Sequence, residues 1–392
     1  MILSFESNTY NSICCMILSF ESNTYNSICC MILSFESSTY NSICCMILSF
    51  ESNTYNSICC MILSFESNTY NSICCMILPI GDMYDVGWGQ KIFKLCEGQG
   101  PPTVIFDAPA GMTSDVWTLI WPHVATHARV CVYDRAGLGF SERPVRNVTE
   151  ADGSDAKRNY RNKWFPFTVE RMADDLYQLM TVASQEPQPF ILVGAELGAL
   201  VSQFYAQMFE STTRALIDNN LPKLCITCRY NYIIPSYQTL QLGAALGITR
   251  LALLLGLLLQ PMSGSELPDI VQYRQKHLLC HPKHLSSVVD EHHFVNESFS
   301  QMKTLRIIKQ LPDNITVTVI TGNYYDEQMP SYLNKAWAKS EQSLLTKHYP
   351  RANHIVINSS DKHMLYRNPK AIIEPVNRII RQYKNRMKTK KQ

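Results

Sequence analysis

The sequence predicts an α/β fold, a mostly parallel central sheet flanked by helices, from about residue 78 onward. Short apolar runs typical of buried strands alternate with segments whose apolar residues recur at helical spacing. Several runs end directly in turn-forming residues, as Tyr133 does before Asp134-Arg-Ala-Gly. Strands that alternate with helices pair in parallel because each crossover returns the chain to the same edge of the sheet.

Six strands and one long crossover helix carry this prediction. The helix spans residues 169–181, with Met172, Leu176 and Leu179 at helical spacing. The strands are expected at residues 103–106, 129–133, 190–193, 215–217, 315–320 and 355–357. The alternation stops between them at residues 219–311, which we interpret as a helical lid inserted into a core of residues 76–218 and 312–385.

Residues 1–75 are five copies of MILSFESNTYNSICC, and Ser38 is the only difference between them. A folded solenoid has atypical terminal repeats and varied positions, so this identity does not fit one. We predict a disordered or artefactual segment, from a recent duplication or a mis-assigned reading frame; a stacked β array is the alternative. The apolar run is short and lacks a basic flank, so no signal peptide is recognisable.

The composition is that of a globular protein. The net charge of +2 gives no electrostatic reason to expect a nucleic-acid partner. Ten of the fifteen cysteines lie in the repeats. The other five show neither a disulfide framework nor a zinc-ligand pattern, so we expect no metal and no other cofactor. They are Cys96, Cys131, Cys225, Cys228 and Cys280.

Two segments raise the question of a membrane. Residues 242–259 are almost wholly apolar, but Arg250 and three glycines interrupt them. We interpret them as two short helices packed on the sheet domain; a lid that dips into a membrane surface and a true span are the alternatives. Residues 378–391 hold seven Lys or Arg and no acid, and the basic tail 386–392 is either a solvated helix end or a lipid-surface patch. The sequence leaves two localisations open: association with a membrane, including that of the endoplasmic reticulum, or the cytoplasm. It does not predict the oligomeric state.

Five short motifs carry a resemblance to a known family. They are Asp107-Ala-Pro-Ala-Gly-Met112 with Trp117, the run from Arg129 to Ser141, Val193-Gly-Ala-Glu-Leu-Gly198 and Ser-Ser-Asp-Lys-His363. With them the chain resembles the α/β-hydrolase superfamily of the single-lid, esterase- and epoxide-hydrolase-like kind, over about residues 78–385. In that family a nucleophile sits on a strained strand-to-helix turn with small neighbours. Here Glu196 stands where the family keeps Ser, Cys or Asp.

The resemblance implies the remaining catalytic roles. His363 would be the base, with His354 as the alternative, and either Asp218 or Asp326 would orient its ring. The backbone N–H groups of an oxyanion hole would come from Leu197 and from Gly111 or Met112. The lid tyrosines Tyr230, Tyr232, Tyr237 and Tyr273 would line the pocket or protonate a leaving oxygen.

Glu196 decides between two functions. Without a hydroxyl at this position, acyl transfer through a serine ester is impossible. The chain is then either a non-catalytic or much altered hydrolase relative that binds a small or lipid-like apolar ligand, or an active hydrolase. In the second case Glu196 would be a carboxylate nucleophile or general base acting with His363 on an epoxide- or ester-type substrate. We favour the binding protein, with a membrane surface reached through the lid and the basic tail as a further partner.

Overall fold

The chain divides into two units, residues 1–78 and Pro79–Gln392, and the computed structural model describes residues of the second only. The described residues are 81–87, 89–144, 167–219, 229–258, 262, 267–322, 331, 335, 338–339, 342, 345–346, 349–358 and 364–391. The predictions made for the repeats, His363, Asp326, Cys225 and Cys228 therefore lie outside the described residues.

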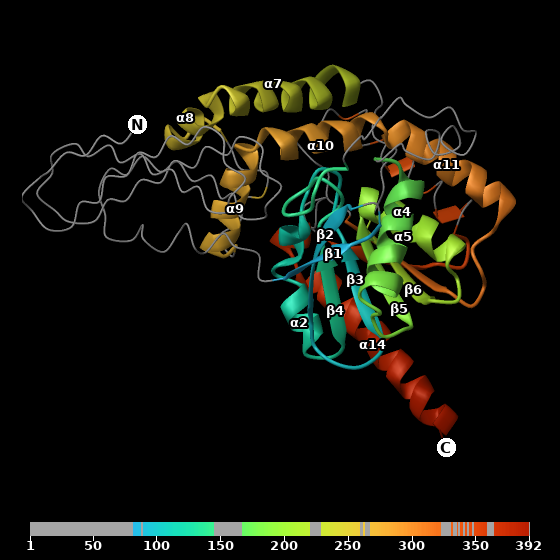
Figure 1. Cartoon of the computed structure of the whole chain (residues 1–392). Coiled ribbons are helices and arrows are strands. Elements are labelled where there is room, and N and C mark those ends of the chain that lie inside the picture. Colours follow the sequence, from blue (N-terminus) through green and yellow to red (C-terminus); the bar gives the residue numbers. More distant parts are fainter. Residues whose placement is uncertain are drawn as a thin grey trace, which may run out of the picture. The chain divides into compact units, whose positions relative to one another are not determined.

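An eight-stranded sheet forms the centre of the second unit, in the order β1-β2-β4-β3-β5-β6-β7-β8 (Figure 1). All neighbours from β4 to β8 pair in parallel, which confirms the predicted fold class. The antiparallel edge strands β1 and β2 were not predicted, because charged residues interrupt their short apolar pattern. The strands are β1 (Asp82–Asp85), β2 (Lys91–Glu97), β3 (Thr103–Asp107), β4 (Arg129–Tyr133), β5 (Phe190–Ala195), β6 (Thr213–Asn219), β7 (Thr316–Gly322) and β8 (Asn353–Ile357).

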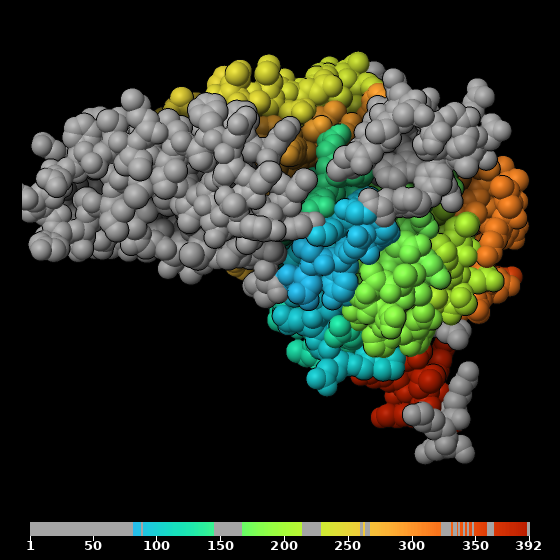
Figure 2. All heavy atoms as spheres, viewed as in Figure 1, coloured from blue at the N-terminus to red at the C-terminus, as the bar shows by residue number. Residues whose placement is uncertain are grey.

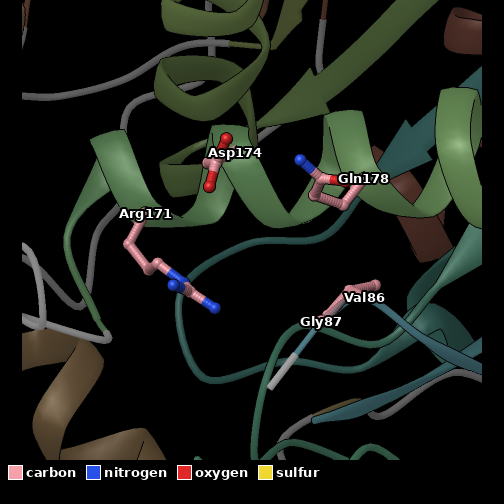
Figure 3. Close-up of a pocket in the computed structure, with 5 residues that line it drawn as sticks. All are labelled: Val86, Gly87, Arg171, Asp174 and Gln178. Atoms are coloured by element: carbon pink, nitrogen blue, oxygen red, sulfur yellow. The ribbon is translucent and has the colours of Figure 1, made fainter. Parts of the chain in front are cut away.

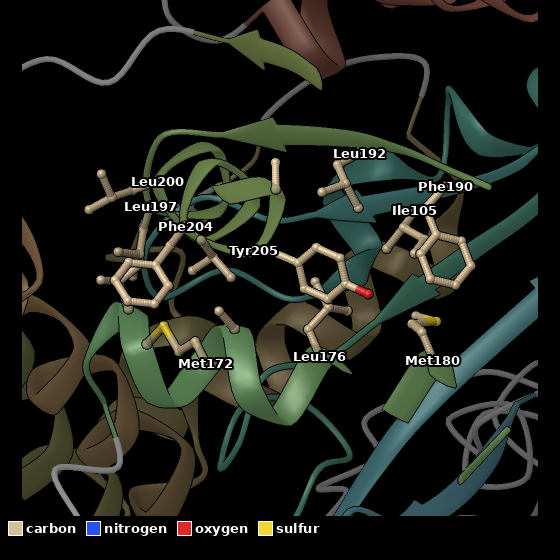
Figure 4. Packing of buried hydrophobic residues seen from close by; sticks show 14 of the residues in the cluster. Ile105, Met172, Leu176, Met180, Phe190, Leu192, Leu197, Leu200, Phe204 and Tyr205 are labelled. Atoms are coloured by element: carbon tan, nitrogen blue, oxygen red, sulfur yellow. The ribbon is translucent and has the colours of Figure 1, made fainter. Parts of the chain in front are cut away.

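Helices cover both faces of the sheet because successive strand residues point to opposite sides. Ile105 and Leu192 face the helices α4 (Val169–Tyr177), α5 (Leu197–Met208) and α11 (Val295–Ile308), and Figure 4 shows this core. Val104, Phe106 and Ile191 belong to the opposite core. That core is closed by η2 (Ser114–Trp117), α2 (Trp121–Ala125), α13 (Met364–Arg367) and α14 (Lys370–Lys391). The π-helical turn η3 (Gln178–Ala183) continues α4.

The helices between β6 and β7 are called the lid below. They are the π-helical turn η4 (Arg229–Ile233), α7 (Ile234–Ala245), α8 (Ile248–Leu254), α9 (Asp269–Leu279), α10 (Pro282–His293) and α11. Residues 242–258 form no continuous helix, because Gly247 takes a left-handed φ of +78° between α7 and α8. Helix α7 lies along α10, and of these two helices α7 is the one farther from the sheet (Figure 1). Among the described residues, no helix is long and apolar enough to cross a membrane.

A disulfide joins Cys96 of β2 to Cys131 of β4, which corrects the expectation that these cysteines form no disulfide framework. The two residues lie directly opposite each other in the antiparallel pair, where side chains on one face come close. The sequence alone did not show this because β2 was not recognised as a strand, so the register of the two cysteines was not available. Cys280 is a free thiol.

Candidate active site

Glu196 lies at the sharp turn between β5 and α5 with φ +48° and ψ −111°, an unusual conformation for a residue with a side chain. The turn depends on the glycines around it. A Cβ atom on Gly194 would lie 2.4 Å from Ala199 Cα, and one on Gly198 would lie 2.5 Å from the carbonyl oxygen of Asp107. This strand-turn-helix geometry presents the half-buried residue 196 at the carboxyl edge of the sheet, as a nucleophile elbow does.

The turn after β3 holds the two backbone N–H groups predicted for the oxyanion hole. The Gly111 N–H donates to Oε2 of Glu291 at 2.7 Å, and the Met112 N–H donates to the carbonyl oxygen of Pro109 at 3.2 Å. Leu197, the third predicted residue, is buried at the first position of α5. A carboxylate from the lid therefore occupies one predicted oxyanion donor.

Glu291 belongs to a buried ion cluster that ties α10 to the core. Its side chain is 0% exposed, and the Arg135 guanidinium donates to Oε1 at 2.7 Å and to Oε2 at 3.0 Å. Arg135 also donates to Oδ1 of Asp107 at 2.6 Å. Burial raises the pKa of Asp107, and the Arg135 charge lowers it in part. Asp107 is thus held by Arg135; neither Arg135 nor Glu291 was predicted as a site residue.

The acid and base of the predicted triad are only partly within the described residues. Asp218 lies near the end of β6, where its backbone is in register with Gly194 of β5 on one side and Val319 of β7 on the other. This register puts Asp218 one strand away from the elbow. His354, the alternative base, lies on β8 with Nε2 2.8 Å from Oγ1 of Thr321. His363 and Asp326 lie outside the described residues.

Tyr237 is the lid tyrosine that the structure brings to Glu196. Its ring stacks on His292 with the ring centres 5.5 Å apart. Burial raises the pKa of Tyr237, and the negative charge of Glu196 raises this pKa further. The other three tyrosines are exposed: Tyr230 donates to the His293 carbonyl oxygen at 3.2 Å, and Tyr232 and Tyr273 lie on the lid surface.

Two further buried lid residues face this region and were not predicted. Burial lowers the pKa of the Arg229 guanidinium, while the charge of Glu196 raises it. Burial lowers the pKa of His292 to about 4, with smaller contributions from Arg229 and Arg135, so its imidazole is neutral near pH 7. Arg229 Nε and His292 Nδ1 are buried and have no hydrogen-bond partner within the part of the chain that the structure describes. No motif marks either residue, because the contacts depend on how the lid folds over the elbow.

A pocket of about 340 Å³ lies elsewhere, between the turn after β1 and helix α4 (Figure 3). It is lined by Val86, Gly87, Arg171, Asp174 and Gln178, none of which is a predicted site residue. Arg171 is engaged with Oδ1 of Asp175 at 2.8 Å. This pocket offers no counterpart of the elbow, so the candidate site remains the region around Glu196.

Comparisons with known proteins agree with this geometry. The family model described as alpha/beta hydrolase fold matches residues 102–220, which include the oxyanion turn and the elbow. None of the curated proteins matches the sequence significantly. Among solved structures, epoxide hydrolase VrEH1 from Vigna radiata has a TM-score of 0.56 at 16% identity, covering 77% of this chain and 97% of that one.

Two other solved structures give the same result. Cfl2 from Burkholderia cenocepacia has a TM-score of 0.53 at 16% identity, with 76% of this chain and 94% of that chain covered. Epoxide hydrolase CorEH has a TM-score of 0.51 at 16% identity, with 74% and 95% covered. Likeness at this level of identity speaks for the fold alone. Together with the family-model match and the elbow geometry, it shows that this chain has the α/β-hydrolase fold.

Proposed function

We propose that this protein binds a small, apolar or lipid-like ligand between the lid and the sheet and does not hydrolyse it through an acyl-enzyme. The observation that carries the proposal is the 2.7 Å hydrogen bond from the Gly111 N–H to the Glu291 carboxylate. An oxyanion hole works by offering free N–H donors to a developing negative charge. A negative charge already bound there repels that transition state, and Glu196 supplies no hydroxyl to start the reaction.

The groups around Glu196 suit recognition of a ligand with an oxygen acceptor. Binding sites of this kind combine apolar walls with a few fixed polar groups. The Tyr237 hydroxyl and the Arg229 guanidinium are two hydrogen-bond donors whose pKa values the charge of Glu196 raises, and Val288 lies against Gly111. A buried donor without a partner costs free energy, so an acceptor atom on a ligand would be stabilised beside Arg229 Nε.

A second candidate is epoxide opening by Glu196, and the position of Tyr237 favours it. The Glu196 carboxylate would attack a ring carbon and break its C–O bond, and Tyr237 would give its proton to the released oxygen. The resulting ester needs an oxyanion hole for its hydrolysis by water. Because Glu291 accepts the Gly111 N–H, this chemistry would stop at the covalent ester, and no diol would be released.

Styrene oxide separates the two candidates because the same compound can bind, alkylate and be hydrolysed. For the binding protein we expect the full-length chain to be stabilised against heat by styrene oxide, with no diol formed and no increase in intact mass. Tyr237→Phe should raise the apparent dissociation constant for styrene oxide by about tenfold, the size expected for one lost hydrogen bond to a ligand.

Tyr232→Phe is the matched control, because Tyr232 is an exposed tyrosine of the same lid. It should bind styrene oxide as the parent does. A covalent adduct that disappears in Glu196→Gln would overturn the binding proposal and establish the carboxylate chemistry. Diol formed at a steady rate and lost in the same variant would overturn it too, and would show in addition that Glu291 does not block hydrolysis of the ester. Equal binding by all the variants would mean that the ligand site is not at the elbow.

A further inference from the structure

Seven large apolar side chains are exposed between the last turn of α7 and the turn that follows α8. Each is between 57% and 73% exposed. The two helices form the outermost layer of the lid, on the side away from the sheet (Figures 1 and 2). These residues, called the lid face below, are Leu242, Leu246, Ile248, Leu251, Leu254, Leu255 and Leu257.

The inner surface of the same helices is also apolar. Ala244 packs with Leu279 of α9 and Leu285 of α10, and Leu240 and Leu253 lie against this cluster. Apart from Thr249 and Arg250, α8 has apolar residues on its exposed side as well as on its inner side, and a helix of this kind is normally buried on all sides, in a large core or in a membrane. The α9 and α10 helices cover only one side of α7 and α8, so the lid face is a surface that water solvates poorly.

The charges around the lid face distinguish a lipid surface from a protein partner. No Asp or Glu occurs between Asn219 and Ser265. Arg250, the single charged residue of α8, is half-buried and acts on His277 and Cys280. The segment that carries the lid face thus offers no acid to repel anionic headgroups. Tyr232, 72% exposed, precedes α7, and tyrosine is favoured where apolar surface meets water.

We propose that the lid face inserts into one leaflet of a lipid bilayer, with α7 and α8 lying in the plane of the membrane surface. Twelve and seven residues are too few to span a hydrocarbon core of about 30 Å, so the helices lie on the membrane and do not cross it. The apolar side chains enter the boundary between headgroups and acyl chains, where burial scales with the apolar area that leaves water.

The basic C-terminal helix does not share this contact. Helix α14 ends at the opposite pole of the described unit from α7 (Figure 1). Lys384, in the second half of α14, donates to the carbonyl oxygen of His127 in the core. A flat bilayer that touches the lid face is therefore beyond the reach of the basic tail, and membrane binding should depend on the leucines.

Flotation with phosphatidylcholine vesicles tests the proposal on the full-length protein. We expect the protein to float with these neutral vesicles and to do so equally at low and high salt, because apolar burial is not screened. Replacing Leu246, Leu251 and Leu254 together by Gln should reduce the bound fraction by at least roughly tenfold, since three exposed side chains lose their transfer free energy.

Ile307→Gln with Ile308→Gln is the matched control. These residues are 78% and 76% exposed at the end of α11, away from the lid face, and their replacement should leave vesicle binding unchanged. Binding that needs anionic lipid, falls with salt and is lost on changing Lys388, Lys390 and Lys391 to Gln would overturn the proposal in favour of the tail. Light scattering that shows a dimer which the three lid substitutions dissociate, without vesicle binding, would assign the lid face to a second copy of the chain.

A tryptophan probe gives an independent measurement that does not rely on loss of binding. Leu254→Trp should show a blue shift and quenching by brominated lipid beyond those of the parent when vesicles are added. Ile308→Trp should show neither. Equal quenching at both positions, or none at position 254, would contradict insertion of the lid face.

Discussion

At the scale of single residues, Glu196 is held in a conformation that favours glycine. A non-glycine residue in such a region costs of order 1–3 kcal/mol and persists only where the surroundings enforce it. Here β5 and α5 are both fixed in the core, and Gly194 and Gly198 leave no room for the turn to relax. The elbow is thus a strained turn with a carboxylate at its centre.

Glu196→Gly should therefore stabilise the fold. We expect the free energy of unfolding to rise by about 1–2 kcal/mol, because glycine adopts a φ of +48° without a Cβ penalty. Glu196→Ala is the control, since it also removes the carboxylate but keeps the strain. Thermal and urea unfolding of the two variants would measure the difference; an alanine variant as stable as the glycine variant would show that the turn is not strained.

Single residues also show what the sequence could reveal. The small neighbours of the elbow and the glycines after Asp134 could be recognised in the sequence, because a sharp turn requires small residues at nearby positions. The Gly111–Glu291 hydrogen bond joins residues 180 positions apart, and Arg135 joins Asp107 to the same carboxylate. Contacts of that separation depend on how the lid packs, which no local pattern encodes. The sequence predicted Tyr237 only as one of four lid tyrosines, and the structure distinguishes it because the other three are exposed.

At the scale of elements, the parallel arrangement of the strands could be predicted and the attachment of the lid could not. Helix α10 is tied to the core by polar contacts near both of its ends. Arg143 pairs with Asp290, Arg135 with Glu291, and the Gly139 N–H donates to His284 Nδ1 at 3.2 Å. Two of the histidines on this helix, His284 and His292, are buried, so the attachment depends on their remaining neutral.

Acid should therefore destabilise the protein through α10. Burial lowers the pKa of His284 to about 3 and that of His292 to about 4, below the ordinary histidine value of 6.5. The unfolded chain then binds protons before the folded one, so stability is full above about pH 6.5 and falls as the pH drops toward the folded values. Each histidine contributes a slope of about 1.4 kcal/mol per pH unit in that window.

His284→Asn tests this dependence because an amide oxygen can still accept from the Gly139 N–H but does not titrate. Urea unfolding at several pH values should show a slope smaller by about 1.4 kcal/mol per pH unit between about pH 6 and 4.5. His123→Asn, at an exposed histidine of α2, should keep the parental slope. An unchanged slope in His284→Asn would mean that this histidine is protonated in the folded protein.

At the scale of the whole molecule, the described unit is a three-layer core capped by a lid, and the disulfide joins its antiparallel edge to its parallel centre. Strands β1 and β2 contact the rest of the sheet through β4 alone. The Cys96–Cys131 bond crosses that single junction. An edge hairpin that pairs with the sheet through one strand is the part of the sheet that separates most easily. The disulfide therefore links the hairpin to the sheet at the one strand pair that joins them.

Removing the disulfide should lower the stability of the whole unit. The bond links residues 35 positions apart, and a loop of that length predicts about 4 kcal/mol of stabilisation through the unfolded chain, less any strain in the folded one. We expect Cys96→Ala with Cys131→Ala to lower the unfolding midpoint, and dithiothreitol to lower the midpoint of the parent by the same amount without affecting the double variant. Cys280→Ala, at a free thiol, should unfold as the parent does in both conditions. If reduction does not change the unfolding midpoint of the parent while the double variant is destabilised, the two cysteines stabilise the β2–β4 junction by packing as thiols, and no covalent link contributes to holding the edge hairpin.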